Sequence, residues 1–360
     1  MKQTQKRKPK KKVNQKNGCG RRRIALAAVL LVVALVGALF GWMALQARVT
    51  HVRKAVVYLD DLPSALDGTT LLYVSDLNIR GEADARRTQR LMNKLSELAP
   101  DVLLLGGDYC GGRILDENPY ADAEGQTAAL DFLRSLNSFR APLGKYAVAG
   151  EQDSVLTGLK EAMFDGGVML LDDGCTTIGK DGAQLVLAGL SDVSKKRTPY
   201  SEIGGYFDGS ECVIALTHNP SGYIGVRVAE ARSGGAWADL VLASHTLGGQ
   251  IKAFGRTIYT LPESEARCLG GWYYAGDLPM LVSQGVGCSG VQLRLGTTSE
   301  VWLLTLRRPE KLDLPDFSSV YDKYIRFQKM FHVTQLASRR SARRGRLFHE
   351  NRVEARRCST

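Results

Sequence analysis

The feature that most constrains this chain is an apolar segment at residues 24–46, IALAAVLLVVALVGALFGWMALQ, in which no side chain is charged. Its 23 residues are enough to cross the hydrocarbon core of a bilayer as a helix, which takes roughly 20. Residues 1–23 before it contain eleven Lys or Arg and no Asp or Glu. The positive-inside rule therefore predicts a single-pass protein of the cell membrane, with residues 1–23 in the cytoplasm and the main domain outside it.

A cleaved signal peptide is the alternative explanation of this segment. The apolar part of a signal peptide usually spans only about 7–15 residues, and no pattern of small residues typical of a cleavage site follows residue 46. We therefore expect an uncleaved anchor. The basic residues 1–23 are also expected to contact anionic headgroups, to which each Lys or Arg near the surface contributes about 1 kcal/mol.

The net charge of +11 belongs to the two ends of the chain. Residues 1–23 contribute +11 and residues 339–360 contribute +6, so residues 24–338 sum to −6. A basic face for nucleic acid is therefore not expected on the folded domain. The end of the chain, residues 311–360, is expected to form a C-terminal helix followed by an Arg-rich, disordered tail.

Apolar segments of strand length alternate with longer amphipathic segments after the anchor. The helical period predicts helices at residues 83–98 and 126–139. Strands that alternate with helices and then dominate the second half favour a layered α/β sandwich. We expect a linker at residues 47–54 and one domain at residues 55–310. Its strands are expected at residues 69–75, 101–105, 145–149, 184–189, 212–216, 240–243, 280–283, 291–295 and 301–306.

Five of these strands end in short turns rich in polar residues or glycine. Two of the five histidines of the chain, His218 and His245, lie in them. Carboxylates and imidazoles at neighbouring strand ends can converge on one point, as a metal ion requires. One such residue alone is more often a cap or a satisfied polar group, but five turns in series predict a candidate metal site. The turns are residues 75–78 (SDLN), 106–108 (GGD), 150–153 (GEQD), 217–220 (THNP) and 244–250 (SHTLGGQ).

The order of these turns resembles the motif series of the calcineurin-like metallophosphoesterases, especially their membrane-anchored bacterial branch. That family has SDLH, GD, GNHD, SHNP-like and GHTHGGQ motifs in the same order, and the resemblance extends from about residue 56 to residue 308. It implies an α/β fold of the four-layer αββα sandwich type, here preceded by the transmembrane helix. It also implies hydrolysis of phosphoesters with two cations about 3.5–4 Å apart that activate a water molecule.

The same resemblance implies which residues would act at the site. The family histidine that is a candidate acid for the leaving group corresponds to Gln152, so the implied catalytic positions are Asp108, Gln152 and His218. The first cation would be held at the positions of Asp76, Asn78, Asp108 and Leu247, and the second at those of Asp108, Glu151, His218 and His245.

Several substitutions distinguish this chain from the family pattern. Asn78 and Leu247 replace histidines; an amide oxygen binds transition metals more weakly than imidazole does, and leucine cannot coordinate. The first site is therefore expected to be weak or empty. Glu151 replaces Asn with a carboxylate, so the second site is expected to hold one Mn, Zn or Fe ion strongly. Gln152 cannot donate a proton as an imidazolium does, and the loss of a general acid typically costs about 10²–10⁴-fold in rate.

Two functions remain open from the sequence. The first is a membrane-anchored, metal-dependent phosphoesterase that hydrolyses a phosphomonoester or phosphodiester outside the membrane, with a lipid or another envelope component as substrate. The second is a pseudoenzyme that keeps the fold and binds a ligand or partner without catalysis. Nucleic-acid binding is not expected, because the two basic ends would lie on opposite sides of the membrane.

Overall fold

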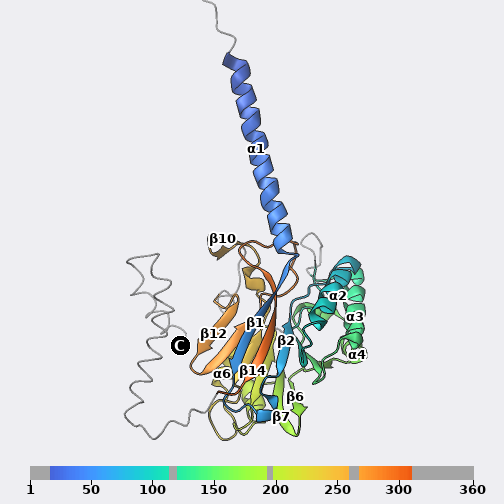
Figure 1. The fold of residues 1–360 in the computed structure, drawn as a ribbon, viewed down its shortest axis with the longest axis vertical. Coiled ribbons are helices and arrows are strands. Elements are labelled where there is room, and N and C mark those ends of the chain that lie inside the picture. The colour runs from blue at the N-terminus through green and yellow to red at the C-terminus, as the bar shows by residue number, and fades with distance from the viewer. Residues whose placement is uncertain (1–16, 113–119, 193–197, 259–266, 310–360) are drawn as a thin grey trace, which may run out of the picture. The chain divides into compact units, whose positions relative to one another are not determined.

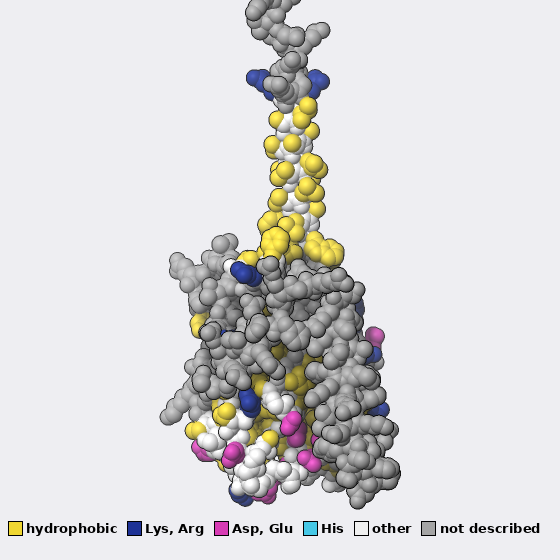
Figure 2. Space-filling model, turned by 90° about the vertical axis from the view of Figure 1, so that its left-hand side faces the viewer, with side chains coloured by type: hydrophobic (Ala, Val, Ile, Leu, Met, Phe, Trp, Pro, Cys, Tyr) yellow, Lys and Arg dark blue, Asp and Glu magenta, His cyan; other side chains and the backbone are white. Residues whose placement is uncertain are grey.

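The computed structural model describes residues 17–112, 120–192, 198–258 and 267–309. It begins with a long helix, α1 (Asn17–Gln46), of which residues Arg22–Gln46 are long and apolar enough to cross a membrane. Apolar side chains are spread around the whole circumference of α1, and Figure 2 shows them along its length with basic side chains at its beginning. A helix that is apolar on every side has no single face to pack on a soluble core, which is typical of a membrane span.

The first of two large sheets holds six strands in the order β1-β14-β2-β3-β4-β5. Neighbouring strands are parallel except for β14 and β2, which are antiparallel. The strands are β1 (Thr50–Tyr58), β2 (Thr70–Val74), β3 (Val102–Leu105), β4 (Lys145–Ala147), β5 (Met169–Leu170) and β14 (Ser299–Arg307).

The second sheet also holds six strands, in the order β12-β13-β9-β8-β7-β6. Its central strands β13, β9, β8 and β7 are parallel, and each edge is an antiparallel pair. A separate two-stranded hairpin joins β10 (Lys252–Ala253) and β11 (Arg256–Thr257). The six strands are β6 (Gly174–Lys180), β7 (Ala183–Leu190), β8 (Val213–Thr217), β9 (Leu240–Ala243), β12 (Gly271–Ala275) and β13 (Leu278–Val282).

Three apolar clusters show that the layers are stacked helix, sheet, sheet, helix (Figure 1). The first joins one face of the first sheet to α2 (Glu82–Ser96), α3 (Ala123–Ser135) and α4 (Leu159–Asp165). The second lies between the sheets, where Leu71 and Leu104 meet side chains such as Leu187. The third joins the second sheet to α5 (Tyr200–Gly204) and α6 (Gly222–Val228). Short 3₁₀ turns lie at Ser64–Leu66, Leu136–Ser138, Gln152–Val155 and Leu247–Gly249.

This arrangement confirms the predicted αββα sandwich. Central strands such as β3 and β9 are buried at every position, as expected of parallel strands covered on both faces. The strand predicted at residues 291–295 is wrong: only Leu295 pairs there, through one isolated bridge to Ile251. Residues 50–54, expected in a linker, belong to β1, whose largely exposed burial pattern hid it in the sequence. The predicted C-terminal helix and tail at residues 311–360 lie outside the described residues, as do residues 1–16.

Candidate metal centre

The predicted site residues all follow the carboxyl ends of strands. Parallel strands bring these ends to one edge of a sheet, and here the edges of both sheets meet because the sheets are packed face to face. The predicted residues are Asp76 and Asn78 after β2, Asp108 after β3, Glu151 and Gln152 after β4, His218 after β8, and His245 and Leu247 after β9.

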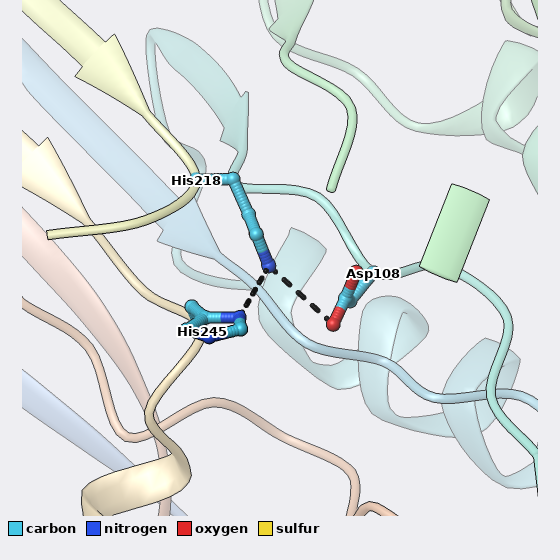
Figure 3. A group of neighbouring side chains, drawn as sticks. All are labelled: Asp108, His218 and His245. Atoms are coloured by element: carbon cyan, nitrogen blue, oxygen red, sulfur yellow. Dashed lines mark hydrogen bonds and ion pairs between the residues drawn. The ribbon is translucent and has the colours of Figure 1, made fainter. Parts of the chain in front are cut away.

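Three of these side chains converge. Asp108, His218 and His245 each offer one ligand atom, and these atoms lie within 4.8 Å of one another (Figure 3). The Nε2 atom of His218 lies 3.4 Å from Oδ2 of Asp108 and 3.3 Å from Nδ1 of His245. The first residue comes from the first sheet and the two histidines from the second, so the site lies where the two sheets face each other.

Glu151 lies beside this triad. Its Oε2 atom is 3.6 Å from Nδ1 of His245, and its side chain is 36% exposed, whereas that of His218 is fully buried. Burial raises the pKa of the Glu151 carboxyl, against the opposing charge of His245. Glu151 is therefore the solvent-facing member of the set of four ligands that the sequence predicted.

The orientation of His218 is fixed by its second nitrogen. Nδ1 lies 2.7 Å from the carbonyl oxygen of Gly106, and because a carbonyl can only accept, Nδ1 must carry the proton. The hydroxyl of Ser244 donates to the same carbonyl at 2.9 Å. Nε2 is then the nitrogen that faces Asp108 and His245, as in metal-binding histidines that are held by a backbone carbonyl.

Electrostatics at this point favour a positive charge. Burial would lower the pKa of His218, but the charge and hydrogen bond of Asp108, together with the charge of Asp76, hold it well above its usual value. Burial would likewise raise the pKa of Asp108, but the charge of His218 and its contact with the carboxylate hold it below the usual range. Burial raises the pKa of Asp76 to about 6. A cation held between these groups would balance the buried carboxylates.

Asp153 organises the backbone around Asp108. Its buried carboxylate accepts hydrogen bonds from the backbone N–H groups of Asp108, Tyr109 and Gly150 at 2.8, 2.7 and 2.8 Å. It thereby ties the loop after β3 to the loop after β4. Burial, followed by the charge of Asp108, raises its pKa to about 7. The signal of this role in the sequence is its position as the last residue of the GEQD turn.

The loops at the site need glycine and a strained backbone. A Cβ atom on Gly150 would lie 2.1 Å from Oδ1 of Asp108, and one on Gly107 would lie 2.7 Å from Nδ1 of His218. Asp108 has a φ of 55° and His245 a φ of 73°, in the left-handed region that non-glycine residues avoid. Strain of this kind costs on the order of 1–3 kcal/mol per residue and concentrates at functional sites.

The other half of the predicted site is different. Asp76 is fully buried; its Oδ1 accepts from the backbone N–H of His245 at 3.0 Å, and its Oδ2 has no hydrogen-bond partner among the described residues. Asn78 is buried beside Gly111, at which a Cβ atom would lie 2.7 Å from the Asn78 amide oxygen. Leu247 is buried and offers no ligand atom. These residues leave one strong ligand, Asp76, on this side.

Arg294 is a buried residue with a clear role in holding the loops of the site. It is fully buried, and its guanidinium donates to the carbonyl oxygens of five residues. Through them it joins the turn that carries Leu247 to the loop at residues 284–287, which packs behind Asp76. Arg294 therefore positions the site without reaching it. The five acceptors are Leu247, Gln284, Gly285, Gly287 and Thr298.

The described residues bring together one group of side chains that could hold a metal ion. Two imidazole nitrogens and the carboxylate of Asp108 converge, with the carboxylate of Glu151 beside them, and such a mixed set of nitrogen and oxygen ligands suits a transition metal. The Oδ2 atom of Asp76, which has no hydrogen-bond partner in the part of the chain that the structure describes, favours a cation on the other side.

Comparison with known proteins gives relatives but no family model, since none matches the chain. YpbG, an uncharacterized protein of Bacillus subtilis, is 27% identical over 290 residues, which are 80% of this chain and 98% of that protein. An uncharacterized metallophosphoesterase of Aquifex aeolicus is 26% identical over 289 residues, 77% of this chain and 98% of its own. A transmembrane protein with metallophosphoesterase domain from Danio rerio is 23% identical over 299 residues, 79% of this chain and 62% of its own.

These similarities have low identity, but they cover most of the chain and agree with both the motif order and the αββα layers. The name of the relative from Danio rerio combines a transmembrane protein with such a domain. In this chain one helix is long and apolar enough to cross a membrane. The chain is therefore a relative of the metallophosphoesterases.

Proposed function

We propose that this protein is a membrane-anchored, metal-dependent hydrolase of phosphoesters that holds one transition-metal ion strongly. The observation that carries the proposal is the convergence of Asp108, His218 and His245, with Nε2 of His218 facing the other two. Glu151 is the proposed fourth ligand. The relatives named as metallophosphoesterases support the reaction class.

Each residue has a distinct task in this proposal. An ion held by the four ligands would supply Lewis-acid chemistry, polarising a phosphoryl oxygen and lowering the pKa of a water molecule. Asp153 and Arg294 hold the loops so that the ligands keep their directions. Gln152 takes the place where the family has an acid for the leaving group, and an amide has no proton to give at neutral pH. The chain should therefore act best on esters whose leaving group needs no proton.

The proposed setting is the membrane surface. We infer that α1 is an uncleaved anchor, that residues 1–23 are cytoplasmic and contact anionic headgroups, and that the sandwich domain is outside the cytoplasm. The proposed substrates are phosphomonoesters or phosphodiesters of lipid or other envelope components. Support for the orientation comes from the eleven basic residues before the apolar segment.

A pseudoenzyme is the second candidate, and a specific observation favours it. Leu247 is buried at a position where the family coordinates a cation, and Gln152 replaces the candidate acid with a side chain whose buried Oε1 has no partner among the described residues. In this alternative the same residues bind a ligand or a partner without turnover.

Metal analysis and turnover on the full-length protein in detergent distinguish the two. The hydrolase should contain about one equivalent of tightly bound transition metal and cleave bis(p-nitrophenyl) phosphate, an activated phosphodiester. Asp108→Ala and His218→Ala should remove both properties, and Asp165→Ala, which changes an exposed carboxylate on α4, should change neither. Turnover that survives both site variants would refute the hydrolase, and a metal-bound protein without turnover would favour the pseudoenzyme.

A further inference from the structure

The edge of the sandwich that carries the candidate metal site is also the edge at which the chain enters from α1. Strand β14 runs antiparallel to β2, with Trp302 opposite Tyr73, so β14 begins beside the end of β2 that leads to Asp76. Strand β1 is parallel to β14 and begins at the same level, with Thr50 opposite Ser299. The strand that follows α1 therefore starts at the site edge.

Little chain separates this edge from the anchor. Helix α1 ends at Gln46 and β1 begins at Thr50, and four residues of extended chain span at most roughly 14 Å. Two hydrogen bonds also hold the end of α1 against the folded domain. The backbone N–H of Arg294 donates to the carbonyl of Met43 at 3.1 Å, and the guanidinium of Arg87 donates to the carbonyl of Ala47 at 3.1 Å. The end of α1 is thus attached to the loop that contains Arg294 and to helix α2.

The β10–β11 hairpin projects from the same edge. It directly follows the turn at residues 244–250, and the backbone N–H of Lys252 donates to the carbonyl of Leu295 at 2.8 Å, next to the residue that binds Met43. Figure 1 shows β10 at the end of the folded body where β1 begins. The hairpin therefore lies beside both the site loop and the end of α1.

The tip of this hairpin is apolar and strained. Phe254 is fully exposed and has a φ of 52°, followed by Gly255 with a φ of 82°. A turn with two positive φ angles usually has Asn or Asp at the first position. A phenylalanine at that position costs conformational free energy, so the stability of the turn does not explain why it is there. Ile258 is also exposed, and Lys252 and Arg256 flank the tip. An exposed aromatic and an isoleucine flanked by cations are typical of contact with a membrane interface.

We propose that the β10–β11 hairpin inserts Phe254 into the headgroup region of the bilayer that α1 spans, so that the site edge faces the membrane. The substrate would then be a phosphoester carried by a lipid of that same leaflet. This last step rests on the proposed hydrolase function, whereas the membrane contact of Phe254 does not. The cations Lys252 and Arg256 would lie at the level of the lipid phosphates.

Phe164 provides a matched control. It is an exposed phenylalanine at the end of α4, just before β5 begins at Met169. Because β5 is parallel to β4, whose carboxyl end leads to the site, Phe164 lies toward the opposite edge of the sheet. If exposed aromatic side chains bound lipid in general, both phenylalanines would contact the membrane. In the proposed orientation only Phe254 does.

Fluorescence quenching tests the contact without any need for turnover. Full-length protein carrying Trp42→Phe is combined with Phe254→Trp or Phe164→Trp and placed in vesicles of phosphatidylcholine and phosphatidylglycerol, with or without brominated acyl chains. The emission added by Phe254→Trp should be blue-shifted and largely lost in brominated vesicles, and that added by Phe164→Trp should be unaffected. Equal quenching of the two, or none of either, overturns the proposal.

A second measurement tests the substrate. A phospholipid with a p-nitrophenyl phosphodiester headgroup reacts with water by cleavage of the P–O bond to the phenol, which yields phosphatidic acid and p-nitrophenol. Phe254→Ser should lower the ratio of turnover on this vesicle-borne lipid to turnover on soluble bis(p-nitrophenyl) phosphate, and Phe164→Ser should leave the ratio unchanged. An unchanged ratio with Phe254→Ser overturns the lipid substrate. If the unsubstituted protein cleaves neither compound, the hydrolase function fails, and the quenching experiment still decides the membrane contact.

Discussion

The two halves of the candidate metal centre have the same origin in the fold and different chemistry. On one side, Asp108, His218 and His245 bring ligand atoms within 4.8 Å of one another. On the other, Asp108 is shared, and the described residues add the buried carboxylate of Asp76, the amide of Asn78 and the buried side chain of Leu247. Both halves lie on strained turns after parallel strands, so the backbone that would position two cations is present on both sides.

This difference indicates that backbone and ligands can change independently. Leu247 has a φ of 52° and Asn78 a φ of 48°, a costly conformation in residues with a side chain. Neither side chain is a strong metal ligand, so metal binding does not offset this cost. The same backbone conformation instead serves the side that contains Asp108, His218 and His245. The turn that contains His245 also contains Leu247. The backbone N–H of Asn78 donates to the carbonyl of Asp108 at 2.9 Å. Loss of ligands in one half therefore does not require a new fold.

The largest effect is expected from the same substitution made on each side. Asp108→Asn should remove the ion and lower turnover of an activated phosphodiester by about 10³-fold, equivalent to about 4 kcal/mol of transition-state stabilisation. Asp76→Asn, which removes no member of the group Asp108, His218 and His245, should leave the metal content near one equivalent. Metal analysis by plasma emission and initial rates measure both. Equal loss of metal in the two variants would show that the halves are not as different as the geometry indicates.

The next largest effect on turnover is expected when a proton donor is restored at the position of Gln152. Gln152→His should raise turnover of an alkyl phosphodiester by about 100-fold, toward the lower end of what general acid catalysis contributes, and should change turnover of a p-nitrophenyl ester little. The reason is that p-nitrophenolate leaves without a proton and an alkoxide does not. A plot of rate against the pKa of the leaving group measures this, and an equal gain on both esters would contradict it.

Restoring ligands to the weak half should have a smaller effect on rate and a clear effect on binding. Asn78→His combined with Leu247→His should increase the bound metal from about one to about two equivalents and raise turnover by roughly tenfold. Isothermal titration with Mn²⁺ or Zn²⁺ measures the stoichiometry, with the Leu247→His single variant as control. A protein that still binds one ion would show that the backbone of this half no longer fits a cation.

Much of this architecture could be predicted from local sequence, and the predictions that were wrong have physical causes. Strands β3 and β9 are apolar runs buried on both faces, a pattern that needs no tertiary information. The false strand at residues 291–295 contains Arg294, whose alternating neighbours suggested a strand although its guanidinium binds carbonyls up to 47 residues away. Such contacts are not encoded in nearby residues.

The site was predicted in part for the same reason. Asp108, His218 and His245 were found from the order of their turns, and their convergence is what the strand ends of two packed sheets produce. The role of Asp153 was not found, because it depends on three backbone N–H groups from two different loops. The catalytic and ligand assignments of all the predicted site residues stay predictions: Asp76, Asn78, Asp108, Glu151, Gln152, His218 and His245.

The smallest expected effect is on thermal stability, and it compares the unsubstituted protein with the Asp108→Asn variant. An ion that binds only the folded protein stabilises it by about 2.7 kcal/mol at a concentration 100 times its dissociation constant. Removal with a chelator should therefore lower the melting temperature by several degrees for the unsubstituted protein in detergent and not at all for Asp108→Asn. The decrease stays modest because the His218 imidazole, whose pKa Asp108 and Asp76 hold high against burial, can take up a proton and return a positive charge to the site. Calorimetry with and without chelator measures the difference, and an equal decrease in both proteins would mean that the ion binds elsewhere.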